Sequence, residues 1–171
     1  MPKPTHLWLL GLSGSGKSTV GPLLAKKLSL PFIDSDERIV QNAKLSIPQI
    51  FAQGGEKEFR HRESGIIAQL AASAASVIAC GGGVVLDPQN RIALSQSGLR
   101  IYLQADLPLL SRRLAHSSDR PLLPPDQIYP KLVEQLAERK KWYEESEIQI
   151  PIGTDSPEQI CGKILLSLPK S

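Results

Sequence analysis

The chain has 171 residues, enough to bury roughly 70% of its unfolded surface in one core and too few to make two independent domains the default expectation. We therefore expect a single domain over residues 1–171. The net charge of +3 is mild, and the basic residues form no run of five or more. This pattern argues against a nucleic-acid or membrane partner and is equally compatible with anionic small molecules.

The apolar run nearest the N-terminus spans residues 7–10, shorter than the core of a secretory signal, and no segment has the apolar length of a transmembrane helix. A cytoplasmic location is therefore expected. Cys80 and Cys161 match no metal-binding spacing and fall in apolar surroundings, so we expect both thiols to be free and buried.

Short apolar runs alternate with helical patterns along the chain. The expected strands are residues 7–10, 31–34, 77–80, 99–103 and 148–152. Helix starts are indicated where a hydroxyl residue precedes an early proline, as at Ser46 and Ser156. The alternation predicts an α/β fold with a parallel sheet covered by helices on both faces. In such sheets ligands lie beyond the carboxyl ends of the strands, so the residues after each strand are the candidates for a site.

Residues 11–18, Gly-Leu-Ser-Gly-Ser-Gly-Lys-Ser, follow the first strand and open a helix, which is the arrangement of a phosphate-binding P-loop. The glycines let successive backbone N–H groups point at phosphate oxygens beside the positive end of a helix dipole. Lys17 would supply a charge for the β- and γ-phosphates, and the Ser18 hydroxyl is placed to bind Mg2+. We expect a nucleoside triphosphate here. The alternative is a flexible Gly/Ser turn without a ligand.

Two carboxylates, Asp34 and Asp36, follow the second strand. Their side chains would point the same way if the backbone is still extended at this point. One could complete the environment of a magnesium ion, while the other could accept a hydrogen bond from a substrate hydroxyl and orient it for attack. The alternative is that Asp36 only caps the following helix.

Three glycines, residues 81–83, follow the third strand and would allow another molecule to approach the backbone closely. A flexible connection is the alternative. Arg60 and Arg139 lie in charge-rich helical segments of the kind that usually form solvated faces. Spacing alone does not distinguish either arginine from its neighbours.

Residues 112–124 read as a lid able to fold over the site, because two arginines and an Arg-Pro segment flank a polar stretch. Closure of a lid excludes water, which prevents wasteful ATP hydrolysis, and can deliver a positive charge to the transferring group. Arg120 is the best candidate for that charge. An ordinary surface loop is the alternative.

Taken together and in order, the motifs resemble shikimate kinase across almost the whole chain; they occupy residues 14–19, 34–36, 54–60, 81–83 and 120–123, with Arg139 and Tyr143. The resemblance implies a P-loop kinase fold of three αβα layers, with a five-stranded parallel sheet in the order 2-3-1-4-5 and a lid. It also implies Mg2+-dependent transfer of the ATP γ-phosphoryl group to the 3-hydroxyl of shikimate, in chorismate and aromatic amino-acid biosynthesis. The size and the lack of an obvious exposed apolar segment favour a monomer.

The resemblance also implies residue roles. Shikimate would be bound by Asp36, Arg60, the backbone at Gly82 and Arg139, and the metal by Ser18 and Asp34. The implied ATP-binding residues are Gly14, Ser15, Gly16, Lys17, Ser18, Thr19 and Arg120, and the implied catalytic residues are Lys17, Asp36 and Arg120. These assignments suit the substrate, because paired guanidinium groups match its carboxylate and an aspartate accepts hydrogen bonds from its hydroxyls.

The sequence departs from the family pattern at two places. Ala79 stands where members often carry a Ser or Thr that contacts magnesium-bound water, and residues 153–157 lack the arginine that some members place near adenine. Backbone contacts or Arg113 could serve the adenine instead. Two alternatives stay open, namely a gluconate or nucleoside-monophosphate kinase with the same core, and a GTPase-type switch, although the chain has no Asn-Lys-x-Asp guanine-reading element.

Overall fold

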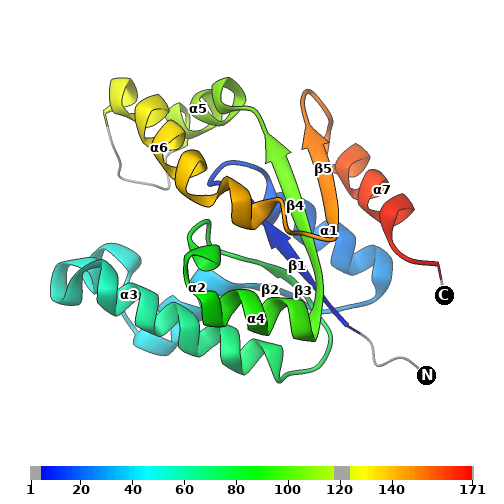
Figure 1. Ribbon diagram of the computed structural model, residues 1–171, viewed down its shortest axis with the longest axis horizontal. Coiled ribbons are helices and arrows are strands. Elements are labelled where there is room, and N and C mark those ends of the chain that lie inside the picture. The colour runs from blue at the N-terminus through cyan, green and yellow to red at the C-terminus, as the bar shows by residue number, and fades with distance from the viewer. Residues whose placement is uncertain (1–4, 118–123, 171) are drawn as a thin grey trace.

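The computed structural model of the protein describes residues 5–117 and 124–170. Its centre is a parallel sheet in the order β2-β3-β1-β4-β5 (Figure 1), which confirms the implied topology. The strands are β1 (His6–Leu10), β2 (Phe32–Asp34), β3 (Val77–Ala79), β4 (Gly98–Ala105) and β5 (Ile148–Ile152). All five expected strands are present. β4 begins one residue earlier and ends two residues later than expected, because its residues 98–102 pair with β1 and its residues 101–105 pair with β5.

The helices are α1 (Lys17–Leu28), α2 (Ser35–Ala43), α3 (Ile47–Ala71), α4 (Pro88–Ser97), α5 (Leu107–Ala115), α6 (Pro125–Tyr143) and α7 (Pro157–Ser167), with a 3-10 turn, η1 (Val84–Leu86). Both expected helix starts are confirmed, since Ser46 and Ser156 each form a capping box with a glutamine three residues later. The long helix α3 is interrupted at Gly55, whose φ of 71° and ψ of −170° are not helical.

Alternating side chains of the central strand β1 belong to two separate clusters of the buried core. Trp8 and Leu10 belong to a cluster that includes buried residues of α3, α4 and α6. Leu7 and Leu9 belong to a second cluster with α1 and α7. The sheet is therefore covered on both faces, as the pattern of its strands predicted. The two cysteines are free and buried, one in each cluster, as expected.

The carboxyl ends of three neighbouring strands lie in register. Leu9 of β1 pairs with Ala79 of β3, which in turn pairs with Asp34 of β2. The P-loop, the aspartates and the three glycines therefore leave the sheet side by side at one edge. This register is what brings together segments that lie up to about seventy residues apart in the chain.

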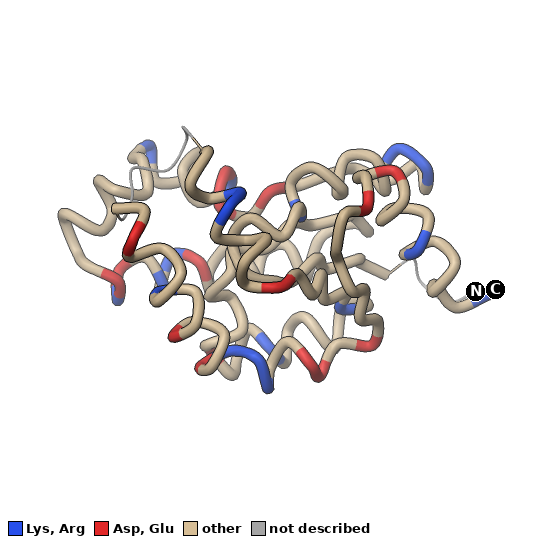
Figure 2. Tube along the Cα trace, turned by 90° about the horizontal axis from the view of Figure 1, so that it is seen from above, with Lys and Arg blue, Asp and Glu red and all other residues tan. Residues whose placement is uncertain are grey.

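Acidic and basic residues are interspersed along the described chain (Figure 2). Some form exposed pairs, such as Lys163 with Asp155 at 2.9 Å, of a kind that contributes little to stability. Within residues 5–117 and 124–170, no helix combines the length and apolar character needed to span a membrane.

The start of β4 has room for no side chain. A Cβ atom on Gly98 would lie 2.2 Å from the backbone oxygen of His6, with which Gly98 pairs in the sheet. The strand could move aside only by disturbing the central β1–β4 pairing. We expect Gly98→Ala to lower the free energy of unfolding by about 3 kcal/mol, measured by urea denaturation.

Gly162→Ala in α7 is the matched control, because nothing lies within 4 Å of a Cβ atom at that position. It should raise the free energy of unfolding by about 0.5–1 kcal/mol through the better helix propensity of alanine. Equal effects of the two substitutions would contradict the steric account of Gly98.

Candidate active site

The P-loop, residues 11–18, connects β1 to α1. Gly14 and Gly16 have positive φ values of 86° and 99°, and Gly16 is the N-cap of α1. The Lys17 ammonium group folds back over the loop and donates hydrogen bonds to the carbonyls of Gly11 at 2.6 Å and Leu12 at 3.0 Å. The loop therefore has the tight curvature of a phosphate cradle, with the lysine largely buried inside it.

The last turn of α5 lies against the P-loop. Arg113 donates from Nη1 to the carbonyl oxygen of Gly14 at 3.0 Å. Because α5 continues to Ala115, Arg112 and Arg113, the first residues of the expected lid, are helical. Residues 118–123, which include Arg120, lie outside the described residues, so the role of Arg120 stays a prediction.

Ser18 and Asp34 meet beside the P-loop. The Ser18 hydroxyl donates to Asp34 Oδ2 at 2.8 Å, while Oδ1 accepts hydrogen bonds from the backbone N–H groups of Asp36 and Glu37. Asp34 is thus also the N-cap of α2. Within the described residues no group of three or more His, Cys, Asp or Glu side chains could hold a metal. Mg2+ commonly takes one or two protein oxygens and completes its shell with water and phosphate, so this pair fits it.

Asp36 lies beside the P-loop and the glycine segment, but not for the reason that the sequence argument gave. Asp34 is the extended last residue of β2, but Ser35 and Asp36 already belong to α2, so the alternation argument was wrong. The capping alternative is wrong too, because Asp34 is the cap. Asp36 instead lies in the first turn of α2, where its Oδ1 would be 2.7 Å from a Cβ atom on Gly81. Buried Ser35 supports this approach by accepting a 3.1 Å hydrogen bond from the Gly81 N–H.

The glycine segment, residues 81–83, runs past both candidate arginines. A Cβ atom on Gly83 would lie 2.3 Å from Arg60 Nη2, and one on Gly82 would lie 3.3 Å from Arg139 Nη1. The same position on Gly82 is 3.5 Å from the carbonyl oxygen of Gly11 in the P-loop. The absence of side chains therefore allows guanidinium groups from α3 and α6 to approach one stretch of backbone beside the P-loop.

Glu63 is a buried carboxylate that the sequence analysis did not single out. Its side chain is 1% exposed, and Oε1 accepts a 2.8 Å hydrogen bond from Arg60 Nη1. Its Oε2 has no hydrogen-bond partner among the described residues. Burial raises the pKa of Glu63 to about 7, and the nearby Asp36 also raises it, against the opposing effect of Arg60. The i,i+3 spacing from Arg60 could have suggested the pairing, but nothing in this charge-rich segment signals burial.

The raised pKa of Glu63 predicts a pH-dependent contribution to stability. Because the folded state holds this proton more tightly than a chain with the ordinary pKa of 4.5, the stabilising contribution is full below about pH 4.5 and is lost as the pH rises through 7. Glutamine resembles the protonated form. We expect the free energy of unfolding of Glu63→Gln, relative to wild type, to rise from pH 4.5 to 7 and then level off. Urea denaturation across this range checks it, and a difference independent of pH would contradict it.

Tyr143 and Arg139 lie one turn apart on α6 and are both buried. The Tyr143 hydroxyl donates a short hydrogen bond to the carbonyl oxygen of Gly82, and its ring stacks on Tyr102 with 5.0 Å between centroids. Burial raises the pKa of Tyr143, which keeps its hydroxyl a donor at neutral pH. Arg139 Nε has no hydrogen-bond partner among the described residues. A buried guanidinium with an unsatisfied donor suits an anionic ligand.

Comparison with known proteins agrees with this geometry. The family model described as shikimate kinase matches residues 13–169. A shikimate kinase from Trichormus variabilis is 40% identical over 165 residues, covering 96% of this chain and 91% of the relative. Among solved structures, shikimate kinase from Acinetobacter baumannii in complex with shikimate aligns with a TM-score of 0.89 at 34% identity, covering 94% of this chain and 90% of that one. The Aquifex aeolicus shikimate kinase aligns with a TM-score of 0.80 at 35% identity, covering 95% of each chain. The chain therefore belongs to the shikimate kinase family.

Proposed function

We infer that the protein transfers the γ-phosphoryl group of ATP to the 3-hydroxyl of shikimate, giving shikimate 3-phosphate and ADP in chorismate and aromatic amino-acid biosynthesis. The observation that carries this proposal is the approach of Asp36, Arg60 and Arg139 to the glycine segment beside the P-loop. Two guanidinium groups suit the carboxylate of shikimate, and the aspartate suits its hydroxyls.

ATP would bind with its phosphates in the P-loop. Lys17 already lies inside the loop, and it would exchange its bonds to the Gly11 and Leu12 carbonyls for phosphate oxygens. Arg120 would add a second positive charge. Contributing residues would be Gly14, Ser15, Gly16, Lys17, Ser18, Thr19 and Arg120.

Ser18 and Asp34 would hold Mg2+, and the 2.8 Å hydrogen bond between them supports this assignment. The ion supplies charge neutralisation at the β- and γ-phosphates when it is bound. Asp34 keeps its N-cap bonds to α2 through its other oxygen, so its carboxylate stays fixed beside the P-loop.

Catalysis would depend mainly on positioning and charge neutralisation, as expected for the loose transition state of phosphoryl transfer. Asp36 would orient the attacking hydroxyl and accept its proton. Arg60 and Arg139 would hold the carboxylate at the other side of the ring. Glu63 would fix the Arg60 guanidinium through their 2.8 Å ion pair, and the backbone at Gly82 would contact the substrate.

We also propose a cytoplasmic monomer whose partners are small-molecule substrates rather than nucleic acid or membrane. The mild net charge and the interspersed signs of the charges argue against a nucleic-acid or membrane partner. Light scattering after size-exclusion chromatography would test the monomer, and a stable dimer at micromolar concentration would contradict it.

An acceptor screen tests the proposed reaction directly. ADP release is followed with ATP and Mg2+ in the presence of shikimate, gluconate or nucleoside monophosphates. We expect shikimate to exceed the other acceptors by at least about 100-fold in kcat/KM. Its ring holds the carboxylate and the hydroxyls at fixed separations, whereas gluconate is a flexible open chain and nucleoside monophosphates have no carboxylate. Preference for gluconate or a nucleotide would overturn the assignment. Tight GTP binding with slow hydrolysis and no acceptor would favour a nucleotide-operated switch instead.

A further inference from the structure

Side chains from two helices hold the glycine segment and the backbone that follows it. From α6, the Tyr143 hydroxyl donates to the carbonyl oxygen of Gly82. From α4, Arg91 Nη1 donates to the carbonyl oxygens of Val85 at 2.6 Å and Leu86 at 3.3 Å. The position of Gly82 therefore depends on both helices and on how they are joined.

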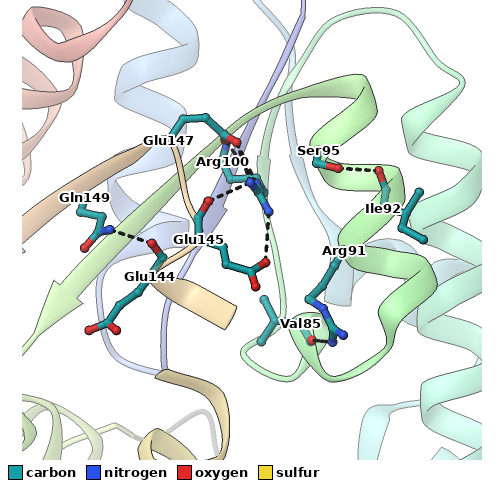
Figure 3. A network of polar contacts seen from close by, with 9 residues as sticks. All are labelled: Val85, Arg91, Ile92, Ser95, Arg100, Glu144, Glu145, Glu147 and Gln149. Carbon is teal, nitrogen blue, oxygen red and sulfur yellow. Dashed lines mark hydrogen bonds and ion pairs between the residues drawn. The ribbon is translucent and has the colours of Figure 1, made fainter. Parts of the chain in front are cut away.

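Arg91 also connects α4 to α6. Its guanidinium carbon lies 3.6 Å from the centroid of the Trp142 ring. Its Nη1 atom donates to the carbonyl oxygen of Val85 (Figure 3). Trp142 is half-buried, immediately precedes Tyr143 and lies three residues after Arg139. A guanidinium stacked on a partly desolvated indole gains both cation–π attraction and planar packing, which a lysine cannot fully reproduce.

The end of α6 is itself anchored to the sheet. Arg100 of β4 donates to the backbone oxygen of Glu145 at 2.7 Å and to the Glu147 carboxylate at 2.6 Å, just beyond the helix (Figure 3). The last turn of α6, which carries Trp142 and Tyr143, is thus fixed relative to β4. Arg91 therefore connects the turn η1 to a part of α6 that is held in place by β4.

We propose that Arg91 is a positioning residue for the acceptor. Stacked on Trp142, it ties residues 84–86 to α6 and so sets the distance between the Gly82 backbone and the Arg139 guanidinium. The inference rests on the proposed function, in which Gly82 and Arg139 both contact shikimate. Hydrogen bonds to a carboxylate weaken steeply with small changes in distance and angle, so a loosened η1 would weaken shikimate binding more than ATP binding.

Steady-state kinetics of Arg91→Met test the proposal, with shikimate varied at saturating ATP and then ATP varied at saturating shikimate. We expect the shikimate KM to rise on the order of tenfold, with the ATP KM and kcat changed by no more than about threefold. Arg91→Lys should restore part of the shikimate KM, because it keeps a positive charge near the indole and a donor for the Val85 carbonyl. If Arg91→Met is too unstable to assay, Arg91→Lys alone tests the proposal. A shikimate KM equal to that of the wild type, in whichever of the two variants can be assayed, would overturn it.

A double-mutant cycle tests whether Arg91 and Trp142 affect shikimate binding through their contact with each other or independently. Trp142→Leu should raise the shikimate KM as Arg91→Met does, and the double variant should be no worse than the worse single variant, because both changes break the same link. Multiplicative effects of the two changes on KM would contradict a shared role.

Arg100→Met is the matched control, since Arg100 anchors the same end of α6 through Glu145 and Glu147 and does not hold residues 84–86 as Arg91 does. It should lower the Tm and raise the shikimate KM by no more than about threefold, because the stack of Arg91 on Trp142 and the bonds of Arg91 to Val85 and Leu86 remain. A rise in KM equal to that of Arg91→Met would indicate general loosening of α6 and overturn the specific role of Arg91. Failure of the wild-type protein to phosphorylate shikimate would instead remove the proposed function, so the two failures are distinguishable.

Discussion

Asp36→Asn is expected to lower kcat with shikimate by on the order of 100-fold or more while leaving ATP affinity nearly unchanged. Asparagine keeps the shape of the side chain but loses the negative charge and the ability to take a proton. Asp36 lies in the first turn of α2, and its Oδ1 atom lies against Gly81. Steady-state kinetics and calorimetric titration with an ATP analogue measure the two quantities.

Glu37→Gln provides the control for this experiment. Glu37 occupies the same helical turn, is exposed, and contributes only its backbone N–H to Asp34. Its replacement should change kcat by less than about twofold, as expected for a surface site away from the chemistry. Ordinary turnover by Asp36→Asn would show that the carboxylate does not act on the attacking hydroxyl.

Arg139→Lys is expected to raise the shikimate KM on the order of 30-fold, with a smaller effect on the ATP KM. Arg139 is 8% exposed, with Nη1 3.3 Å from a Cβ position on Gly82 and Nε unsatisfied among the described residues. A lysine ammonium is a point charge and cannot form two parallel hydrogen bonds to a carboxylate. Initial-rate kinetics with varied shikimate measure the effect.

Lys140→Met, at the exposed neighbouring position on α6, is the control for loss of positive charge in this region. Its shikimate KM should stay close to that of the wild type. If Arg139→Lys bound shikimate as tightly as the wild type, Arg139 would not hold the carboxylate in a bidentate manner.

Features encoded by local sequence were predictable. Buried parallel strands leave uninterrupted apolar runs, so all five were found, with differences only at their ends. The P-loop is likewise local, since its curvature follows from the glycines at positions 14 and 16. The placement of candidate sites at the strand ends followed from the parallel sheet, and the register of Leu9, Asp34 and Ala79 brings the carboxyl ends of these three strands together.

Features that depend on packing between distant segments were not predictable. Asp36 was selected by an argument about extended backbone that the early start of α2 contradicts. The burial of Glu63 depends on the contact of α3 with the glycine segment, which its polar neighbours give no reason to expect. The C-terminal end of α5, by contrast, could have been predicted from the local sequence, because Arg112 and Arg113 suit the negative end of a helix dipole.

The most direct test of the acceptor site is a crystal structure of the protein with shikimate and a non-hydrolysable ATP analogue. We predict the shikimate carboxylate between the guanidinium groups of Arg60 and Arg139, and the 3-hydroxyl within hydrogen-bond distance of Asp36 and facing the terminal phosphate. Shikimate bound elsewhere, or with its carboxylate away from both arginines, would contradict the account.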